Sequence, residues 1–218
     1  MIFSHESPEY MDWKRWHISS PQKHNGAFYY SCEIVDNIIP NVKTTRNWVT
    51  INMKGHCWNH SIVFIHNNKI KSLYKWLRDY DDLVLVCGIP ETCDMVADLG
   101  TPIYLPLSVD VAYVEQFKRP KDKGICFAGR QEKRFGIDLG RRITTIENVP
   151  REIMLSEVAR HEKCYAVGRC AIEAKILGCE ILPYDPRFPD VDRWQVLDNR
   201  DAATILQAKL DEIDGCAK

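Results

Sequence analysis

The sequence lacks the broad signals that would direct it to a membrane, a secretory route or a polyanion. Its net charge is -1 at pH 7, so the whole chain has no global attraction to nucleic acid or to anionic lipid. No apolar run approaches the roughly 20 residues that a membrane helix needs. The first residues lack the cationic and apolar regions of a signal peptide. We therefore expect a cytoplasmic chain without a membrane span.

Paired cysteine motifs are also absent, although the chain holds nine cysteines. The odd number and the scattered positions argue against a disulfide framework. Several lie in apolar, strand-like runs, such as Cys87 in VLVCG and Cys126 in ICFAG. Buried free thiols of this kind suit a reducing compartment. His56, Cys57 and His60 could ligate zinc, but no fourth ligand is evident, so we do not expect a metal there.

Two common nucleotide-binding motifs are missing as well. The chain has neither the three-glycine dinucleotide motif nor a P-loop, so NAD binding and ATP hydrolysis are poorly supported. The segment AGRQEKRFG nevertheless follows a strand-like run and combines Gly129 with Arg130, Lys133 and Arg134. A glycine lets the backbone approach a phosphate, and the following helix and the basic side chains supply amides and charge. This pattern favours a nucleotide phosphate, with a surface arginine after a tight turn as the alternative.

Strand-like and helix-like segments alternate over most of the chain. The expected strands are 47–53, 61–68, 83–88, 102–109, 124–130, 142–149, 163–168 and 179–186. The expected helices are 68–80, 90–100, 111–117, 151–162, 169–178 and 200–215, with one of uncertain length ending near 139. Such alternation indicates parallel sheets flanked by helices. About four strands fall on each side of 108–124, so we expect two small Rossmann-like domains facing each other, with one doubly wound sheet as the alternative.

Specific residues define the expected helix ends and buried faces. Pro90 is expected to open one helix and Gly100 to close it, and Gly215 is expected to stop the last helix. Helical spacing turns Ile153, Met154 and Val158 inward on the helix after Pro150, with Leu155 as a further candidate. On the last helix the apolar residues of one side are Ala202, Ile205, Leu206, Leu210 and Ile213.

Polar or glycine-containing segments follow three of the expected strands directly. In Rossmann-like domains ligands bind at the carboxyl ends of strands and at helix N-termini. The segments are Gly129-Arg130, Gly168-Arg169 and His66-Asn67-Asn68. The helix after Gly168 also carries one acid, Glu173, among apolar residues. Glu173 either lies on the solvent face of that helix or reaches a ligand bound at its start.

The stretch from Tyr165 to Gly178 resembles a motif of the retaining, group 1 type of GT-B glycosyltransferases. That motif reads E-x-F-G-x-x-x-x-E-A-x-x-x-G, and this chain has Gly168, Glu173-Ala174 and Gly178 in the matching places, with Tyr165 instead of the first acid. The resemblance extends over roughly residues 60 to 190. It implies that Glu173 binds the ribose hydroxyls of a nucleotide.

The resemblance also implies roles for residues outside this stretch. Arg130 and Lys133 would contact the diphosphate, with Arg134 as the rival of Lys133. His66 would orient the sugar or act as a base. Together with Gly129, Tyr165, Gly168, Arg169 and Glu173, these residues make up the expected site. Because basic side chains would neutralise the diphosphate, the resemblance implies a metal-independent reaction without a cofactor.

The implied function is transfer of a hexose-type sugar from a nucleotide-diphosphate donor to an acceptor hydroxyl. We expect an acceptor-side domain at 1–108, a nucleotide-sugar domain at 109–200 and a C-terminal helix at 201–218 that could pack back on the first domain. The acceptor could be a glycan, a small molecule or modified DNA, since small GT-B enzymes that glycosylate hydroxymethylated bases occur in phages. A module that binds nucleotide sugars without catalysis is a further alternative.

Two charged segments allow competing interpretations. Nine basic residues between Lys118 and Arg142 indicate a local anionic ligand, although those before Gly124 fit an ordinary solvated loop equally well. Asp190 and Asp192 form an Asp-x-Asp pair, which in another glycosyltransferase class holds a metal. Because this pair follows the last strand of its domain, a surface loop is the favoured interpretation.

Overall fold

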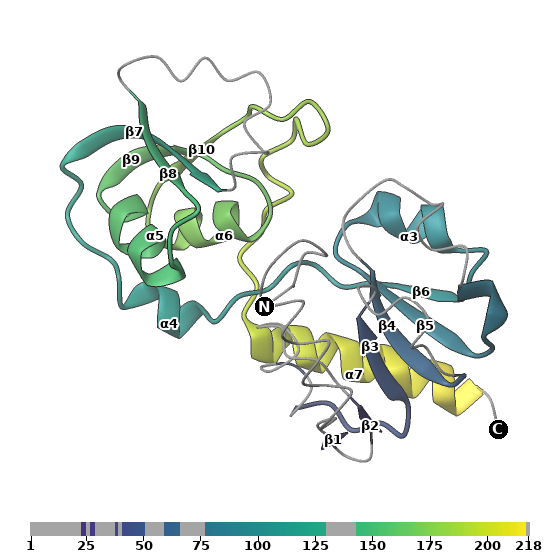
Figure 1. Ribbon diagram of the computed structural model, residues 1–218. Coiled ribbons are helices and arrows are strands. Elements are labelled where there is room, and N and C mark those ends of the chain that lie inside the picture. Colours follow the sequence, from purple (N-terminus) through teal and green to yellow (C-terminus); the bar gives the residue numbers. More distant parts are fainter. Residues whose placement is uncertain are drawn as a thin grey trace. The chain divides into compact units, whose positions relative to one another are not determined.

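The computed structural model describes residues 23–24, 27–28, 38, 41–50, 59–65, 77–129 and 143–216. The chain divides into two compact units, one formed by Met1–Pro106 with Arg200–Lys218 and the other by Leu107–Asn199. Each unit contains a four-stranded parallel sheet flanked by helices (Figure 1), which confirms the expected α/β class. Among the described residues, no helix is long and apolar enough to cross a membrane.

The strands of the first unit's sheet lie side by side in chain order. The strands are β3 (Asn47–Thr50), β4 (Ser61–Ile65), β5 (Leu83–Cys87) and β6 (Thr101–Tyr104), and each neighbouring pair is parallel. Each overlaps a predicted strand. A short antiparallel pair, β1 (Lys23–His24) and β2 (Ala27–Phe28), precedes them.

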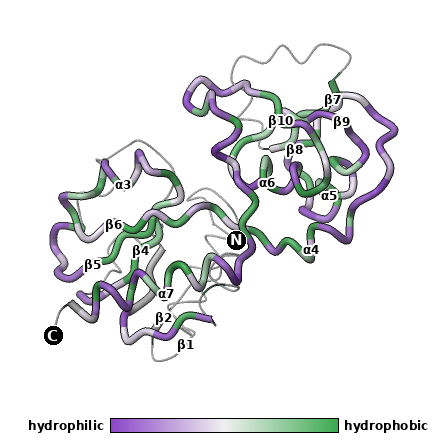
Figure 2. The backbone as a smooth tube through the Cα atoms, turned by 180° about the vertical axis from the view of Figure 1, so that it is seen from behind, coloured by the Kyte–Doolittle hydropathy of each residue, from purple (hydrophilic) through white to green (hydrophobic). Residues whose placement is uncertain are grey.

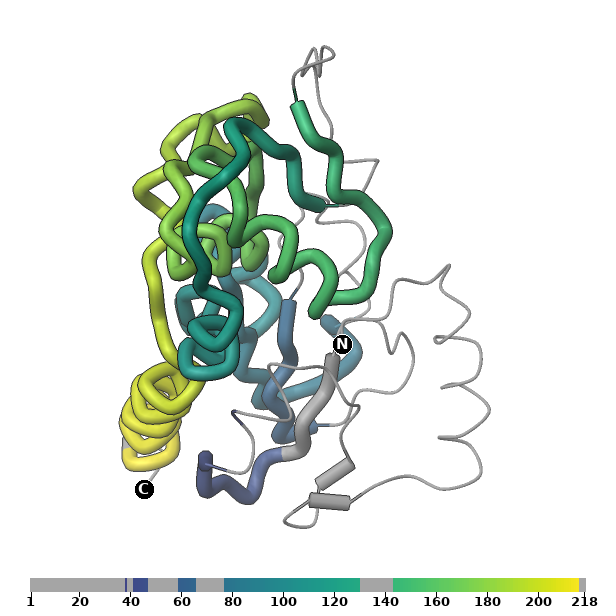
Figure 3. Tube along the Cα trace, turned by 90° about the vertical axis from the view of Figure 1, so that its left-hand side faces the viewer, coloured from purple at the N-terminus to yellow at the C-terminus, as the bar shows by residue number. Residues whose placement is uncertain are grey.

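The core of the first unit lies on the two faces of this sheet. β5 is buried along its whole length, as its uninterrupted apolar sequence predicts. On one face Val63 and Leu85 pack in a cluster with Val96 of α3 (Pro90–Val96). α7 (Asn199–Cys216) lies along the same sheet (Figures 1 and 3). The hydropathy colouring of Figure 2 shows that β4 and β5 are made mainly of hydrophobic residues. The buried residues of α7 are Ala202, Ala203, Leu206 and Leu210.

Gly100 has a different role from the one expected of it. α3 begins at Pro90 as predicted but ends at Val96, before Gly100 is reached. A Cβ atom at Gly100 would lie 2.7 Å from the carbonyl oxygen of Leu83, which is too close for any side chain. The glycine is therefore needed because the chain passes close to β5, and the helix-stop prediction was wrong.

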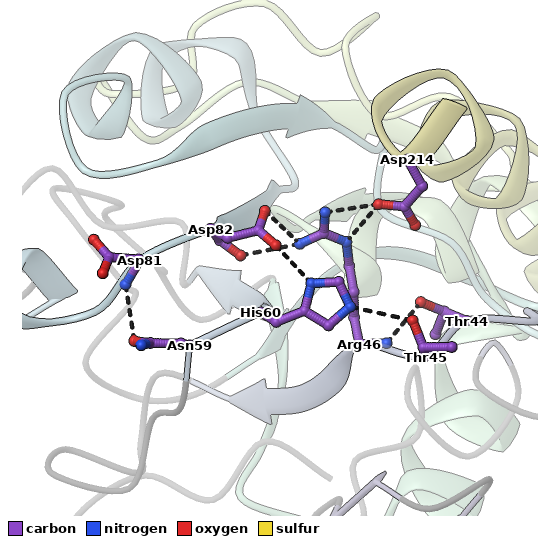
Figure 4. Close-up of polar contacts among 8 residues, drawn as sticks. All are labelled: Thr44, Thr45, Arg46, Asn59, His60, Asp81, Asp82 and Asp214. Atoms are coloured by element: carbon purple, nitrogen blue, oxygen red, sulfur yellow. Dashed lines mark hydrogen bonds and ion pairs between the residues drawn. The ribbon is translucent and has the colours of Figure 1, made fainter. Parts of the chain in front are cut away.

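A cluster around Arg46 ties α7 to the amino end of the first sheet (Figure 4). Arg46, directly before β3, donates from Nε and Nη2 to Oδ1 of Asp214 on α7, at 3.0 and 2.7 Å. Its Nη1 donates to the backbone oxygen and to Oδ1 of Asp82, directly before β5, both at 2.9 Å. His60 Nδ1 lies 2.6 Å from Oδ2 of Asp82. Burial would raise the pKa of Asp82, but hydrogen bonds from His60 and Arg46 hold that pKa below its ordinary value.

The second unit's sheet has its strands in a different order. Its strands are β7 (Lys123–Gly129), β8 (Ile143–Glu147), β9 (His161–Tyr165) and β10 (Glu180–Leu182). They are ordered β10-β9-β7-β8, and every neighbouring pair is parallel. β8 therefore lies on one side of β7, and β9 and β10 lie on the other. The point where the order reverses, between β7 and β9, is a topological switch point.

Three short helices pack together in this unit. They are α4 (Val111–Glu115), α5 (Arg151–Val158) and α6 (Arg169–Ile176), and α6 contacts both α4 and α5. The connections that contain α5 and α6 advance in the same direction across the sheet, so the right-handed crossover rule puts both on one face. Asp110 caps α4 by accepting a hydrogen bond from the amide of Tyr113 at 2.9 Å.

Two of the residues expected to face inward on helices are exposed. Ile153 on α5 is 51% exposed and Ile205 on α7 is 38% exposed, although helical spacing turned both inward. Val158 was also expected inward and is buried in α5 together with Leu155, and Ala202, Leu206 and Leu210 are buried in α7 as expected. α7 ends at Cys216, one residue after the glycine that was expected to stop it, Gly215.

The cysteines in the described part of the chain are free thiols, as predicted. Four of them, Cys87, Cys126, Cys164 and Cys179, are buried, and Cys93 and Cys170 are partly buried. Burial raises the pKa of the Cys87 thiol well above its ordinary value. The same direction holds for Cys164, where a hydrogen bond with Cys126 is the main cause and burial adds to it. Such thiols stay neutral and act as small apolar core residues.

Candidate functional site

The carboxyl ends of β7 and β9 lie next to each other at the switch point of the second sheet. Phe127 of β7 pairs with Tyr165, the last residue of β9. Gly129 ends β7, and Gly168 follows β9 by three residues. The sequence predicted that Gly129 and Gly168 each follow a strand, and the strand order places these two segments next to each other at the carboxyl edge of the sheet. This edge is where ligands bind in open parallel sheets.

Gly168 has a backbone conformation that side chains do not tolerate well. It is the N-cap of α6 with φ 64° and ψ -140°, and its carbonyl accepts hydrogen bonds from the amides of Ala171 and Ile172. A residue with a Cβ atom would be strained there. No side chain caps α6 at this position, and Arg169 is its first residue. The start of α6 thus offers backbone amides and a positive dipole end, which suit an anionic group.

Glu173 lies on the second turn of α6 and is only 4% exposed. The alternative that placed it on the solvent face of the helix was therefore wrong. Its Oε1 accepts hydrogen bonds from Nε of Arg151 at 3.0 Å and from Nη2 of Arg151 at 2.8 Å. A buried carboxylate is costly unless it is paired, and Arg151 supplies the charge that pairs it.

Arg151 was not among the candidate residues found in the sequence. It is the first residue of α5, which follows β8, and β8 lies beside β7. Its guanidinium carbon lies 5.0 Å from the centre of the Tyr113 ring, and the Tyr113 hydroxyl donates to Oε1 of Glu152 at 3.2 Å. Arg151 is thus held between the ring of Tyr113 and the carboxylate of Glu173. The one signal in the sequence was an arginine directly after Pro150, where a strand end meets a helix start.

Aromatic rings surround the ends of β7 and β9. The ring of Tyr165 meets that of Tyr184 edge-on, with centres 6.1 Å apart, and Tyr184 meets Phe127 in the same way at 5.8 Å. The hydroxyl of Tyr184 is buried and has no hydrogen-bond partner among the described residues. Burial raises the pKa of Tyr184 well above its ordinary value, so this hydroxyl stays protonated. Tyr165 is thus part of an aromatic cluster where the resembling motif has an acid.

Several predicted residues cannot be assigned a structural role. His66, Arg130, Lys133 and Arg134 lie outside the described residues, as do His56, Cys57, Asn67 and Asn68. The third member of the candidate zinc group, His60, belongs to the Arg46 cluster, and its Nε2 also lies 3.1 Å from Oγ1 of Thr45.

The basic residues before Gly124 have partners within the protein. Lys118 pairs with Glu115, Arg119 bonds Ser156, Lys121 bonds the carbonyl of Leu177, and Lys123 pairs with Glu157. This segment lies at the amino end of β7, at the opposite end of the strand from Gly129. The structure therefore favours the surface interpretation for these four residues.

The Asp-x-Asp pair forms part of a turn. Oδ1 of Asp190 accepts a hydrogen bond from the amide of Asp192 at 2.8 Å, which is a common way for aspartate to stabilise a turn. Across the described ranges, no group of three or more His, Cys, Asp or Glu side chains is arranged to hold a metal ion. The hydrogen bond within the turn is consistent with the favoured interpretation of this pair as a surface loop.

Comparison with known proteins does not identify a relative. No protein-family model, curated protein or solved structure matches this chain.

Proposed function

We propose that this chain is a GT-B-type glycosyltransferase that moves a sugar from a nucleotide-diphosphate donor to an acceptor hydroxyl. One observation carries the proposal. The ends of β7 and β9 pair at a switch point, where the Gly168 turn, the start of α6 and the buried Glu173–Arg151 pair lie on connected segments. The motif resemblance of residues 165–178 gives these features their proposed roles.

The proposed chemistry depends on stabilising a leaving diphosphate. As the bond to the sugar breaks, negative charge accumulates on the diphosphate, and fixed positive groups at that point lower the barrier. The amides at the start of α6 would supply part of this stabilisation. Arg130 and Lys133 would supply the rest, as the family resemblance implies. Glu173 would accept hydrogen bonds from the ribose, since a carboxylate can accept several at once.

A second candidate is a nucleotide-sugar-binding module without catalysis. The observation that favours it is Tyr165, which stands where the resembling motif has an acid and which packs edge-on against Tyr184. A tyrosine in this aromatic cluster cannot act as a carboxylate toward the transferred sugar. Hydrolysis of a donor sugar separates the two functions, because a binding module would release no free sugar.

The proposal is tested first by a thermal-shift panel of nucleoside diphosphates and nucleotide sugars. A ligand that binds only the folded state raises the melting temperature. Calorimetry with the best ligand then compares Arg130→Ala with Arg142→Ala, both on folded protein.

We expect Arg130→Ala to weaken binding of the diphosphate about tenfold or more, since a hydrogen bond to a charged group contributes about 1.5–3 kcal/mol. Arg142→Ala should change binding by less than about twofold, because Arg142 does not directly follow Gly129 in the sequence. Binding should also survive EDTA. Equal losses in both variants would indicate a diffuse basic surface instead of a phosphate site.

A further inference from the structure

Three neighbouring strands of the first sheet bring a threonine, a histidine and an aspartate together at their amino ends. The strands β3, β4 and β5 start in register, since the first residue of each pairs with the first residue of its neighbour. His60 directly precedes β4, Asp82 directly precedes β5, and Thr45 lies two residues before β3. Although these residues are separated in the sequence, their side chains therefore meet at one edge of the sheet (Figure 4).

The three side chains form a continuous series of polar contacts. Oγ1 of Thr45 lies 3.1 Å from Nε2 of His60, and Nδ1 of His60 lies 2.6 Å from Oδ2 of Asp82. An ionised carboxylate only accepts hydrogen bonds, so Nδ1 donates to Asp82. In the neutral ring Nε2 is then the acceptor for the Thr45 hydroxyl. A hydroxyl, a histidine and a carboxylate in this order are the nucleophile, base and orienting group of serine hydrolases.

The histidine is held from several directions. Its backbone amide donates to the carbonyl of Asp81 at 3.1 Å, and the amide of Asp81 donates to Oδ1 of Asn59 at 2.9 Å. Arg46 holds Asp82 through its backbone oxygen and its Oδ1, whereas the contact with His60 is made by Oδ2. A base whose ring and orienting partner are both fixed is preorganised for proton transfer.

Two members of this group have backbone conformations that cost energy. The φ angle is 58° at His60 and 55° at Asp82, in the left-handed region that residues with a side chain seldom adopt. Such residues persist where surrounding contacts hold them, and they gather at functional sites. Thr45 is exposed and the side chain of His60 is 45% exposed, so a small molecule in solution can reach both.

We propose that Thr45 is a nucleophile and His60 its general base in an ester-hydrolysing site, separate from the proposed nucleotide site. Oγ1 of Thr45 attacks the carbonyl carbon of the ester, and Nε2 of His60 takes the hydroxyl proton. The bond from that carbon to the leaving alcohol then breaks, and Nε2 gives the proton to the alcohol. Water, deprotonated by His60 in the same way, attacks the acyl-threonine, which releases the acid and restores the Thr45 hydroxyl.

The roles of the other components follow from this scheme. Asp82 is a positioning residue, because it acts only by holding the proton on Nδ1 of His60. The site supplies a nucleophile and a base, so its substrates are esters with a good leaving group, such as phenyl esters. Such esters need the least further stabilisation of the charge that develops on the leaving oxygen.

The test measures release of p-nitrophenol from p-nitrophenyl acetate by the full chain, without nucleotide. Mass spectrometry after an acid quench locates the acetyl group. The variants are Thr45→Val, Thr45→Ser, His60→Gln and Asp82→Asn. Thr204→Val is the matched control, because Thr204 is also an exposed threonine but its hydroxyl donates to the carbonyl of Arg200. Circular dichroism and urea midpoints check folding, and Thr45→Ala replaces Thr45→Val if the latter does not fold.

We expect Thr45→Val and His60→Gln each to slow ester hydrolysis about 100-fold or more, since a general base typically contributes about 100- to 10,000-fold. The acetyl group should be found on residue 45 in the wild-type protein and in Thr45→Ser, which keeps a hydroxyl. Asp82→Asn should slow hydrolysis about tenfold or more and add no loss to His60→Gln. Thr204→Val should keep the wild-type rate.

Nitrogen NMR of the His60 ring gives a readout that a merely structural role of Asp82 would not change. At pH 8, where a histidine is ordinarily neutral, the wild-type ring should carry its proton on Nδ1. Asp82→Asn should move that proton to Nε2, since an aspartate in this place is what fixes the tautomer. A wild-type ring protonated on Nε2 would contradict the proposal even if Asp82→Asn failed to fold.

Two kinetic results would also overturn the proposal. Hydrolysis that survives the loss of the Thr45 hydroxyl but not His60→Gln would make His60 the nucleophile and Thr45 only its neighbour. Wild-type hydrolysis no faster than that of His60→Gln would leave the group with a structural role alone. Neither result bears on the proposed function, because nucleotide binding is measured separately and with different ligands.

Discussion

Two arginine–carboxylate clusters in this chain differ in which partner is buried. In the first unit the arginine is buried and its partners are half exposed: the exposed side-chain fractions are 3% for Arg46, 53% for Asp82 and 40% for Asp214. In the second unit the carboxylate is the buried partner, with 5% for Glu173 and 24% for Arg151. The first cluster lies at the amino ends of strands, and the second lies beyond their carboxyl ends.

The difference indicates that the role of an arginine–carboxylate pair depends on the end of the sheet at which it lies. Ligand sites of parallel sheets lie at carboxyl ends, so the amino ends are free to carry contacts that serve stability alone. Arg46 joins segments more than a hundred residues apart in the sequence, which suits a structural tether. Glu173 is instead buried on the helix that starts at a switch point, where Arg151 pairs with it. We therefore expect changes at the amino ends to alter stability and changes at the carboxyl end to alter binding.

The largest effect should come from Arg46→Met. The change removes the four hydrogen bonds that Arg46 donates to Asp82 and Asp214. Hydrogen bonds to charged groups contribute about 1.5–3 kcal/mol, so the free energy of unfolding should fall by about 3 kcal/mol. Nucleotide affinity should not change. Urea unfolding measures the loss, with an unchanged m-value as the condition for comparison.

Arg78→Met is the control for this change. Arg78 pairs with Asp98 at 2.8 Å, but both side chains are about half exposed. Exposed pairs contribute about 1 kcal/mol at most. A loss from Arg46→Met no larger than that from Arg78→Met would show that the Arg46 cluster is not a tether.

A smaller effect on stability is expected from Gly168→Ala. Alanine has space at this position, because the nearest atom to an added Cβ is 3.8 Å away. The positive φ of 64° remains unfavourable and should cost about 1–3 kcal/mol or shift the turn. Since the turn precedes the start of α6, nucleotide affinity should fall as well.

Gly124→Ala tests whether this loss is specific to the turn. Gly124 lies in β7 with no atom within 4 Å of an added Cβ. Its replacement should leave both stability and affinity within about 0.5 kcal/mol of the wild-type values. If Gly168→Ala also left stability and nucleotide affinity unchanged, the turn at Gly168 would not depend on glycine.

The smallest effect, and one confined to acidic pH, should come from His161 at the amino end of β9. His161 is fully buried, and its Nδ1 lies 2.9 Å from the carbonyl oxygen of Glu157. Burial lowers the pKa of His161 below its ordinary value of about 6.5. As the pH falls below about 6.5, His161 becomes protonated in the unfolded chain but stays neutral in the folded protein. The free energy of unfolding should therefore fall.

Replacing His161 by Gln should flatten this dependence. The free energy of unfolding is measured in urea at pH 7.5 and pH 5.5 for both proteins. The wild-type protein should lose more stability between the two pH values than the variant does. Parallel losses in the two proteins would assign the acid sensitivity to other groups.

Local sequence patterns predicted most of the helices and strands, but they did not predict which strands lie next to each other in a sheet. Apolar runs such as that of β5 are recognisable because a strand buried on both faces has no polar alternation. The position of β7 between β8 and β9 depends on long-range pairing, which no local pattern encodes. Periodicity also turned Ile153 and Ile205 inward, because spacing alone does not say which side of a short helix the rest of the protein covers.

The sequence predicted only some of the residues of the candidate site. Gly168 and Glu173 were found because both belong to one continuous motif. Arg151 was missed because a charged residue in the first turn of a helix usually faces solvent. Its contact with Glu173 exists only because the sheet order places α5 beside α6. Local motifs therefore identified one half of the pair, and the topology supplied the other half.

The central claim is that a nucleotide diphosphate binds at the carboxyl ends of β7 and β9. Hydrogen exchange of the full chain, with and without the nucleotide that gives the largest thermal shift, tests it most directly. The account predicts added protection in peptides covering 148–151 and 165–173, and no change in those covering 118–123 and 156–161. Protection limited to the second pair of peptides, or no protection in either pair with bound nucleotide, would contradict it.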